Sequence, residues 1–330
     1  MTENMLYSII IPSYNRAEEI DELLSSIENL DEPSPEFECV IVDDGSEDNT
    51  KEIVEEHQED SEYSIRFIQQ PNQGPGAARN NGMKQAKGDF FIFLDSDTLV
   101  DSHWLNAIDT AVQNGVQAFG GPDGASEDFT PLQKAINYSM TSFLTTGGIR
   151  GKKKSIGKYY PRSFNMGLSR DVYEEVGGFQ EQQYGEDIDF SRRIYNTGAK
   201  VEFVEDAVVY HKRRSSLFSF ITQVFKMCRA RSVLIQQDKA LLELVYLLPA
   251  ISVLIFAIIV VLALIGSEIA LALLLFGVMG LIIVTAHSLT KTKSIKSAVY
   301  MPVIILAQVF GYGIGLIYGF MRSIIDLDRK

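Results

Sequence analysis

Short apolar runs alternate with amphipathic segments over the first hundred residues of the chain. The runs have the length of buried strands, and the segments between them repeat their apolar side chains at helical spacing. This regular alternation predicts an α/β fold with a mostly parallel sheet and helices on both faces. The predicted strands are residues 6–11, 38–42, 65–69 and 90–94, and the predicted helices are residues 17–30, 50–59 and 76–86.

The regularity loosens after a further helical segment at residues 102–114. Short apolar runs near residues 116–120, 164–168 and 201–204 predict further strands in a mixed arrangement. We therefore expect a parallel half that suits a nucleotide site, followed by a mixed half that suits a platform for a second substrate.

Long and nearly uncharged segments replace this alternation from Leu241 onward. They lie at about residues 241–265, 267–287 and 297–321, and each holds at most one charged side chain. A helix of about 20 residues crosses the roughly 30 Å hydrocarbon core of a bilayer. Buried helices of a soluble core are the alternative, but few soluble helices are apolar on every face. Residues 241–330 are therefore predicted to form a helical transmembrane region.

Basic residues flank these segments unevenly, and membrane proteins keep such residues on the cytoplasmic side. The Gly266-Ser267 turn has none, so we expect it outside, with residues 1–240 and 291–296 in the cytoplasm. The expected location is the plasma membrane of a prokaryote. The basic residues are Lys226, Arg229, Arg231 and Lys239 before the first segment, and Lys291, Lys293 and Lys296 before the third.

The third apolar segment fits a complete span less well than the other two. Three complete spans would place Arg322, Arg329 and Lys330 outside, against the orientation rule. The segment is rich in glycine, so we expect it either to re-enter the membrane or to pack closely against a partner helix. The second possibility leaves open a homo-oligomer formed through the membrane helices.

An amphipathic helix is predicted over residues 215–232, directly before the first apolar segment. Its apolar face fits either an anionic lipid surface or the α/β domain. The expected organisation is an α/β domain over residues 1–214, a linker with this interfacial helix over residues 215–240, and the transmembrane region over residues 241–330.

The chain is acidic, with a formal net charge of −13, and the excess lies in residues 1–240. This balance argues against nucleic acid as the main partner. Cys39 and Cys228 are its only cysteines and lie in apolar patterns, which argues for a reducing compartment without a disulfide framework. No signal peptide is recognised, because the apolar run at residues 9–11 stops at Pro12.

Polar and glycine-rich segments follow the first four predicted strands. In chain order they read IPSYNR, VDDGS, NQGPGAARNNG and LDSD. The carboxyl ends of parallel strands lie along one edge of a sheet, and ligands bind there. Each segment alone is more often an ordinary turn, but four of them at one edge predict a shared site.

Each segment offers a different kind of contact. The Asp43-Asp44 pair can accept hydrogen bonds from a base or from ribose hydroxyls. Gly74 allows close backbone approach at a helix N-terminus, which favours anions, and Arg79 one turn further can fork onto a pyrophosphate. The carboxylates of Asp95-Ser96-Asp97 suit a hard divalent cation that phosphate oxygens also hold.

The order of these motifs resembles that of the family-2 glycosyltransferases. The similarity continues through a second stretch, SFNMGLSRDVYEEVGGFQEQQYGEDIDFSRRIYNTGAKVEFVEDAVVYH, and covers about residues 5–232. The resemblance implies a GT-A fold, here followed by a membrane region. It also implies a nucleoside-diphosphate sugar as donor and a divalent cation, Mg²⁺ or Mn²⁺, as cofactor.

The resemblance assigns roles to single residues on the donor side. Asp44, with Asp43 near it, would contact the base and ribose, Arg79 would meet the pyrophosphate, and Asp95 and Asp97 would hold the metal. The expected donor-side residues are Pro12, Tyr14, Asn15, Arg16, Asp43, Asp44, Gly74, Arg79, Asp95 and Ser96.

Glu186 and Asp187 match the acidic acceptor motif of the family, in which Asp187 would be the catalytic base. A carboxylate in a first helical turn is otherwise most often a cap or a partner of the helix dipole. His211 is expected as a third metal ligand, because some relatives place a histidine here, although a lone histidine is usually structural. Asn165 resembles an acceptor-side position but equally fits a turn.

Residues 147–160 are glycine-rich and basic, and predict a loop beside the acceptor site. Lys152, Lys153 and Lys154 could meet lipid head groups or an acceptor pyrophosphate, whereas a merely solvated loop is the alternative. Processive members of the family carry a Gln-x-x-Arg-Trp signature, whose best counterpart here is residues 223–227 with Lys226 in place of the arginine. Because lysine lacks the planar fork of arginine, we expect transfer of one sugar rather than processive polymerisation.

The expected protein is a membrane-anchored, metal-dependent, inverting glycosyltransferase with Asp187 as general base. It would move one sugar to an acceptor hydroxyl on a lipid-linked or membrane-proximal molecule. A polyprenyl phosphate as acceptor is the alternative within this class. A nucleotidyltransferase, which also uses a metal and a doubly wound sheet, and a catalytically inactive scaffold are the alternatives outside it.

Overall fold

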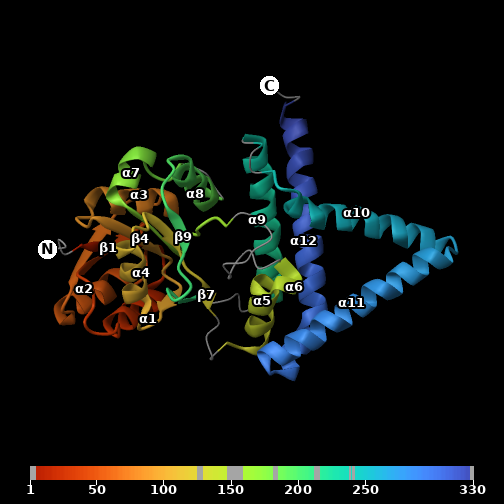
Figure 1. The fold of residues 1–330 in the computed structure, drawn as a ribbon, viewed down its shortest axis with the longest axis horizontal. Coiled ribbons are helices and arrows are strands. Elements are labelled where there is room, and N and C mark those ends of the chain that lie inside the picture. Colours follow the sequence, from red (N-terminus) through yellow and green to blue (C-terminus); the bar gives the residue numbers. More distant parts are fainter. Residues whose placement is uncertain are drawn as a thin grey trace.

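The protein consists of an α/β body and a helical region that lies to one side of it (Figure 1). Helices α9 and α12 run beside the body, and α10 and α11 form a hairpin whose turn points away from it. The computed structural model describes residues 5–124, 129–146, 159–180, 185–211, 216–237, 239 and 242–327.

The α/β body is built on a seven-stranded sheet with the strand order β3-β2-β1-β4-β8-β6-β9. The first four strands in the chain are mutually parallel, whereas β8 runs antiparallel to both β4 and β6. The predicted mixed α/β fold is therefore confirmed. The strands are β1 (Tyr7–Ser13), β2 (Phe37–Asp43), β3 (Ser64–Gln69), β4 (Phe90–Leu94), β6 (Ala118–Gly120), β8 (Asn165–Ser169) and β9 (Val201–Phe203).

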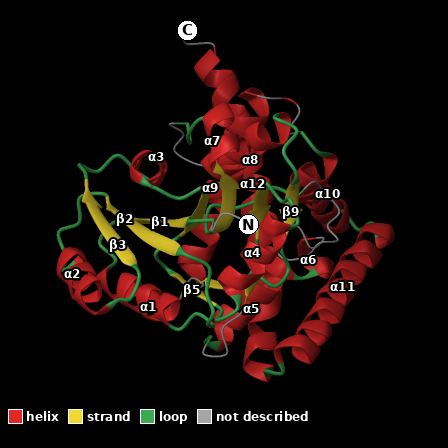
Figure 2. Ribbon diagram, turned by 60° about the vertical axis from the view of Figure 1, so that its left-hand side comes forward, coloured by secondary structure: helices red, strands yellow, loops and turns green. Residues whose placement is uncertain are grey.

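Helices cover both faces of this sheet (Figure 2). Every residue of β1 is buried, and alternate side chains enter different cores, because successive residues of a strand point to opposite faces. Ile9 and Ile11 pack under α1 (Ala17–Glu28), α2 (Thr50–Asp60) and α4 (Trp104–Gln113), whereas Ile10 packs under the helices of the other face. Those are α3 (Pro75–Gln85), α7 (Arg170–Val176) and α8 (Glu186–Asn196).

A second, three-stranded sheet lies beside the end of β4. Its strands are β5 (Thr98–Val100), β10 (Val209–His211) and β7 (Asp123–Gly124), in the order β5-β10-β7. Strand β10 pairs antiparallel with β5, and His211 lies opposite Thr98 in this register. The pairing brings a residue from the end of the body next to the turn after β4.

Three helices in the described part of the chain are long and apolar enough to cross a membrane. They confirm the three apolar segments expected after residue 240. The third is longer than predicted, and its last described residue is Leu327. The helices are α10 (Leu244–Leu264), α11 (Glu268–Thr292) and α12 (Ile295–Leu327), with candidate spans at Leu244–Leu264, Glu268–Thr292 and Ile295–Arg322.

Helix α9 (Leu217–Gln237) packs along α12 rather than along the sheet. Phe220, Val224 and Cys228 of α9 share a core with α12 and with α5 (Pro131–Thr141), beside which lies the short α6 (Phe143–Thr146). The last turns of α9 reach the α/β body, where Leu234 packs on Ile188 of α8.

Glycines on α12 make the close approach to α9 possible. A Cβ at Gly315 would lie 2.7 Å from the carbonyl oxygen of Phe225, and one at Gly319 would collide with Ser232. A Cβ at Gly313 would lie 2.6 Å from the carbonyl oxygen of Pro249 of α10. The glycines of the third apolar segment therefore serve helix packing within the chain, which is one of the two roles expected for them.

Candidate active site

The loops after β1 and β2 are joined to each other at the edge of the sheet. Asn15 has a positive φ of 52°, which short polar side chains tolerate better than others. Its backbone nitrogen donates to Ser46 Oγ at 2.8 Å, and its Oδ1 accepts from the Glu47 nitrogen at 2.8 Å. The predicted meeting of the first two strand ends is thus present in the structure.

Asp43 and Asp44 are buried, with only 1% and 3% of their surface exposed. Asp44 accepts from the backbone nitrogens of Gln73 at 2.9 Å and Gly74 at 2.7 Å, and from Gln70 Nε2 at 2.8 Å. Its carboxylate therefore holds the turn that leads into α3. Contacts of this pair with a base or ribose stay a prediction.

The turn into α3 depends on two glycines. Gly74 has a φ of +91°, which favours glycine, and forms the N-cap of α3. At Gly76 a Cβ would collide with the carboxylate of Glu186, so the start of α3 lies against the start of α8. The third strand end therefore meets the Glu186-Asp187 motif, although more than a hundred residues separate them.

Arg79 joins the third strand end to the fourth. It is 3% exposed, and its Nη2 donates to Asp95 Oδ1 at 2.6 Å while its Nη1 donates to Glu186 Oε1 at 2.6 Å. The guanidinium also lies 5.5 Å from the ring centroid of Phe179. Its Nε has no hydrogen-bond partner among the described residues. The predicted pyrophosphate contact would have to draw this guanidinium partly away from its carboxylates.

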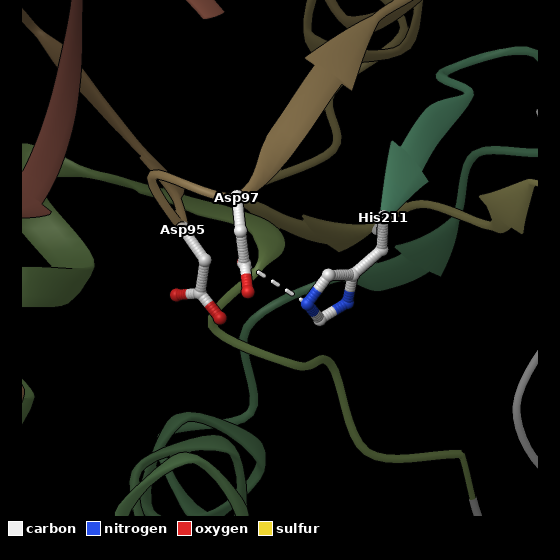
Figure 3. Close-up of side chains that lie close together, drawn as sticks. All are labelled: Asp95, Asp97 and His211. Atoms are coloured by element: carbon white, nitrogen blue, oxygen red, sulfur yellow. Dashed lines mark ion pairs between the residues drawn. The ribbon is translucent and has the colours of Figure 1, made fainter. Parts of the chain in front are cut away.

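Asp95, Asp97 and His211 form a group that could hold a metal ion (Figure 3). One ligand atom from each lies within 4.8 Å of the others, and His211 Nε2 is 3.1 Å from Asp97 Oδ1. Two carboxylates and an imidazole suit Mn²⁺ well and Mg²⁺ less well, because Mg²⁺ prefers oxygen ligands. Burial lowers the pKa of His211, but its hydrogen bond with Asp97 and the nearby carboxylates outweigh burial and leave that pKa raised.

Glu186 and Asp187 begin α8, after Gly185 in a left-handed conformation. Burial raises the pKa of Glu186, and the charge of Asp187 adds to this effect, while Arg79 acts against it. Asp187 Oδ2 accepts from Arg162 Nη1 at 3.1 Å, and its Oδ1 accepts from the Ile188 nitrogen at 2.9 Å. The two adjacent carboxylates therefore bind two different arginines.

Arg162 was not identified from the sequence. It lies three residues before β8 and two residues after the basic segment 147–160 that predicts a loop. Its one distinguishing sign is that it is an arginine just before the Phe164-Asn165-Met166-Gly167 motif. Nothing in the local pattern indicates that it meets Asp187.

The other predicted residues lie in different settings. Asn165 is the first residue of β8 rather than a turn residue, and it is fully buried. It accepts from Trp104 Nε1 at 3.1 Å and donates to the Ala207 oxygen at 2.8 Å, and its acceptor-side role stays a prediction. Tyr14 is exposed, and Arg16 pairs with Glu19. Pro12 and Ser96 are buried, and Lys152, Lys153 and Lys154 lie outside the described residues.

The fold and the site together define a sugar transferase of the GT-A type. The family model described as Glycosyl transferase family 2 matches residues 8–177, which is more than half of the chain. The chain therefore belongs to the family-2 glycosyltransferases, and it is an enzyme of a class that uses nucleotide sugars.

Two relatives show how much of a longer protein the chain matches. It is 30% identical over 220 residues to Glycosyltransferase AglE of Haloferax volcanii, which covers 63% of this chain and 67% of that protein. It is 41% identical over 218 residues to the poly(ribitol-phosphate) beta-N-acetylglucosaminyltransferase TarS of Staphylococcus aureus, covering 63% of this chain but only 35% of TarS.

Two further similarities concern a lipid-linked substrate and the fold. The chain is 34% identical over 113 residues to the GalNAc(5)-diNAcBac-PP-undecaprenol beta-1,3-glucosyltransferase of Campylobacter jejuni, covering 34% of this chain and 35% of that one. The mannosyltransferase PcManGT of Pyrobaculum calidifontis, solved with GDP-Man and Mn²⁺, superimposes with a TM-score of 0.67 at 18% identity, over 96% of this chain and 88% of that one. At this identity the structural likeness supports the fold alone.

Proposed function

We propose that this chain is a membrane-anchored, metal-dependent, inverting glycosyltransferase. It transfers one sugar from a nucleoside-diphosphate sugar to a hydroxyl of a lipid-linked or membrane-proximal acceptor, with Asp187 as the general base. The catalytic body faces the cytoplasm, and α10 and α11 anchor it in the membrane.

One continuous set of ion pairs carries the proposal. Asp95 belongs to the metal-binding group and also pairs with Arg79, which pairs in turn with Glu186 next to Asp187. A donor diphosphate at the metal group would therefore place its sugar near Asp187. This is the arrangement that a single displacement at the anomeric carbon requires.

Asp95, Asp97 and His211 would hold the cation, Mg²⁺ or Mn²⁺, and the cation would neutralise the charge of the leaving diphosphate. Arg79 would stabilise the same charge by turning its fork toward the diphosphate. Asp187 accepts the proton of the acceptor hydroxyl, and Arg162 orients its carboxylate. One displacement inverts the anomeric configuration.

The acceptor class rests on the helical region and on the relatives. The described chain carries three candidate spans, and the Campylobacter relative acts on an undecaprenol-linked diphosphate. TarS, by its name, acts on poly(ribitol-phosphate), so relatives share the chemistry but not the acceptor. A lipid-linked glycan suits a body held next to the bilayer.

The purified full chain in lipid nanodiscs that also carry lipid-linked glycans and polyprenyl phosphate as acceptors, incubated with a panel of nucleotide sugars and Mn²⁺ or Mg²⁺, tests the proposal. Release of nucleoside diphosphate and a lipid-linked product one sugar heavier by mass spectrometry is the expected result. Sugar found on a polyprenyl phosphate would identify the alternative acceptor, and release of pyrophosphate would indicate a nucleotidyltransferase. No turnover with any donor would contradict the enzymatic assignment.

A further inference from the structure

Arg231 is a buried cation at the junction of the α/β body and the helical region. It lies on α9, is 7% exposed, and its guanidinium carbon is 3.1 Å from the ring centroid of Tyr246 near the start of α10. Its Nε and Nη2 are buried and have no hydrogen-bond partner among the described residues.

Burying a guanidinium costs folding free energy unless acceptors bind its N–H groups. Stacking on an aromatic ring stabilises the face of the cation, but it leaves the N–H groups in the guanidinium plane unpaired. Buried donors without acceptors are rare in native structures, and each one calls for an explanation such as a missing ion or ligand. The planar N–H edge of arginine fits a phosphate or carboxylate with two parallel hydrogen bonds.

The surroundings of Arg231 connect it to the catalytic carboxylate. Tyr312 of α12 lies close enough to Arg231 and to Arg162 to feel both charges. Arg162 in turn donates a hydrogen bond to Asp187 at 3.1 Å. Arg162 also lies close enough to Tyr246 for its charge to act on that side chain. The pair of arginines therefore extends from Asp187 toward the start of the first candidate span.

The other charged side chains near this junction are an arginine that already has a carboxylate partner and one glutamate. Tyr160 is within electrostatic reach of Arg231, of Arg192 and of Glu243. Arg192 lies 3.4 Å from Asp189, so it is not an unpaired cation. Glu243, the N-cap of α10, is the one acidic group that the described contacts bring into the same neighbourhood, and no ion pair joins it to Arg231.

The site is separate from the one that serves the donor. Glu186 binds Arg79, which also binds Asp95 of the metal group. Its neighbour Asp187 binds Arg162, which lies near Tyr246 at the start of α10. An acceptor hydroxyl at Asp187 would thus have the donor on one side and the arginine pair on the other.

We propose that Arg231, together with Arg162 and the ring of Tyr246, binds the phosphate or diphosphate group of a lipid-linked acceptor. This inference rests on the proposed function and adds the group by which the acceptor is recognised. Tyr246 lies near the start of α10, at one end of a candidate span, and aromatic side chains are enriched at the ends of membrane spans. Burial of Arg231 favours a specific ligand over bulk phospholipid, for which the exposed Lys226 is better placed.

The test uses the full chain in phosphatidylcholine nanodiscs, with farnesyl diphosphate as the probe and binding measured by calorimetry. The wild type is expected to bind farnesyl diphosphate more tightly than farnesol. Arg231→Gln should weaken the binding of farnesyl diphosphate roughly 10- to 100-fold, which is the usual loss for a charged hydrogen bond. Arg229→Gln, on the opposite side of the same helix, is the matched control and should leave the affinity unchanged.

Three outcomes would overturn the inference. These are equal binding of farnesol and farnesyl diphosphate by the wild type, unchanged affinity in Arg231→Gln, and equally effective competition by phosphatidylglycerol, which would indicate a general lipid site. Arg231→Lys keeps the charge without the fork, so its intermediate loss serves as the measurement if Arg231→Gln does not fold.

Donor measurements separate this inference from the proposed function. If the binding of nucleoside diphosphate weakens with Arg231→Gln as much as that of farnesyl diphosphate, the site belongs to the donor and the inference fails. If the wild type turns over no nucleotide sugar but its diphosphate binding depends on Arg231, the proposed function fails and the anion site stands.

Discussion

The two sides of Asp187, the proposed general base, differ in how their charges are balanced. On the donor side, Arg79 is held by Asp95 and Glu186, and His211 pairs with Asp97. On the membrane side, Arg231 stacks on an aromatic ring and makes no ion pair among the described residues. Each of these donor-side cations is therefore paired with a carboxylate, whereas Arg231 is paired with none among the described residues.

This difference fits the chemistry expected on each side. A small, highly charged donor and its cation need ligands fixed in advance, because preorganisation lowers the cost of stabilising charge in the transition state. An acceptor carried by the membrane brings its own phosphate, and an unpaired arginine fork discriminates in favour of molecules that have one.

Asp187→Asn should separate the two sides most strongly. We expect transfer to fall by about 10³-fold, since removing a general base costs roughly 10²- to 10⁴-fold. Binding of nucleotide and metal should stay close to wild type, because Asp187 pairs with Arg162 and not with Arg79. The measurements are transfer with a radiolabelled donor and nucleotide affinity by calorimetry.

The matched control for Asp187→Asn is Glu205→Gln, which neutralises an exposed carboxylate of the same body. It should leave both transfer and nucleotide affinity unchanged. Transfer at the wild-type rate in Asp187→Asn would show that another group takes the proton, and the neighbouring Glu186 would then be examined first.

Asp97→Asn should affect the donor side alone. It removes a charged ligand of the metal group and the partner of His211, so we expect Mn²⁺ affinity to drop at least about 10-fold. Electron paramagnetic resonance of free Mn²⁺ measures this. Farnesyl diphosphate binding should not change, and Asp206→Asn, at an exposed position, should change neither.

The same metal affinity should depend on pH through His211. Its pKa is raised, so the ring stays protonated to a higher pH than usual, and a metal must displace that proton. Mn²⁺ binding is therefore expected to strengthen as pH rises through the raised pKa of His211. An equally steep pH dependence in His211→Ala would show that another group is responsible.

Gly315→Ala should act on the membrane side. A Cβ there would lie 2.7 Å from the Phe225 oxygen, so α12 and α9 must move apart at a cost of about 1–3 kcal/mol. Because α9 carries Arg231, farnesyl diphosphate binding should weaken while Mn²⁺ binding stays unchanged. Gly277→Ala on α11 is the control, since its Cβ would meet nothing within 4 Å, and thermal unfolding measures both.

How far the sequence predicts each side follows from the distances along the chain. The donor loops follow adjacent parallel strands, so a local pattern places the Asp43-Asp44 pair, Gly74, Arg79 and Asp95 at one edge. The pairing of β10 with β5, which brings His211 to Asp97, depends on a register across more than a hundred residues. No periodicity within either short strand indicates that register.

On the membrane side, the sequence predicts which segments are apolar helices but not which side chains meet. Apolar length identified the three candidate spans, and glycine content indicated close packing of the third. The meeting of Arg162 with Asp187 depends on how the segment before β8 lies against the start of α8. The burial of Arg231 depends on how α9 lies between α8 and α12. The sequence predicts Arg231 as a basic residue on the polar face of its helix that sets orientation, but the structure buries it. A charge count does not show which side chain is buried.

A pair of helices far from both sides offers the smallest expected effect. His57 of α2 contacts Glu28 through Nδ1 at 2.8 Å and Asp21 through Nε2 at 2.9 Å, which links α2 to α1. Burial lowers the pKa of His57, but the two hydrogen bonds and the two charges outweigh burial and leave that pKa raised.

The link between α1 and α2 should therefore stabilise the protein only when His57 is protonated. A raised folded-state pKa means that the stabilisation is fully present below the ordinary value of 6.5 and is lost as pH rises through the raised value.

His57→Gln should lower the free energy of unfolding by at most about 1 kcal/mol at pH 6 and by less at pH 8, because solvent screens the two carboxylates. His103→Gln, at an exposed histidine, is the control. Thermal unfolding at the two pH values measures the difference, and a larger loss at pH 8 would contradict the assigned charge state. Transfer and diphosphate binding should be unchanged, since this link contacts neither side of Asp187.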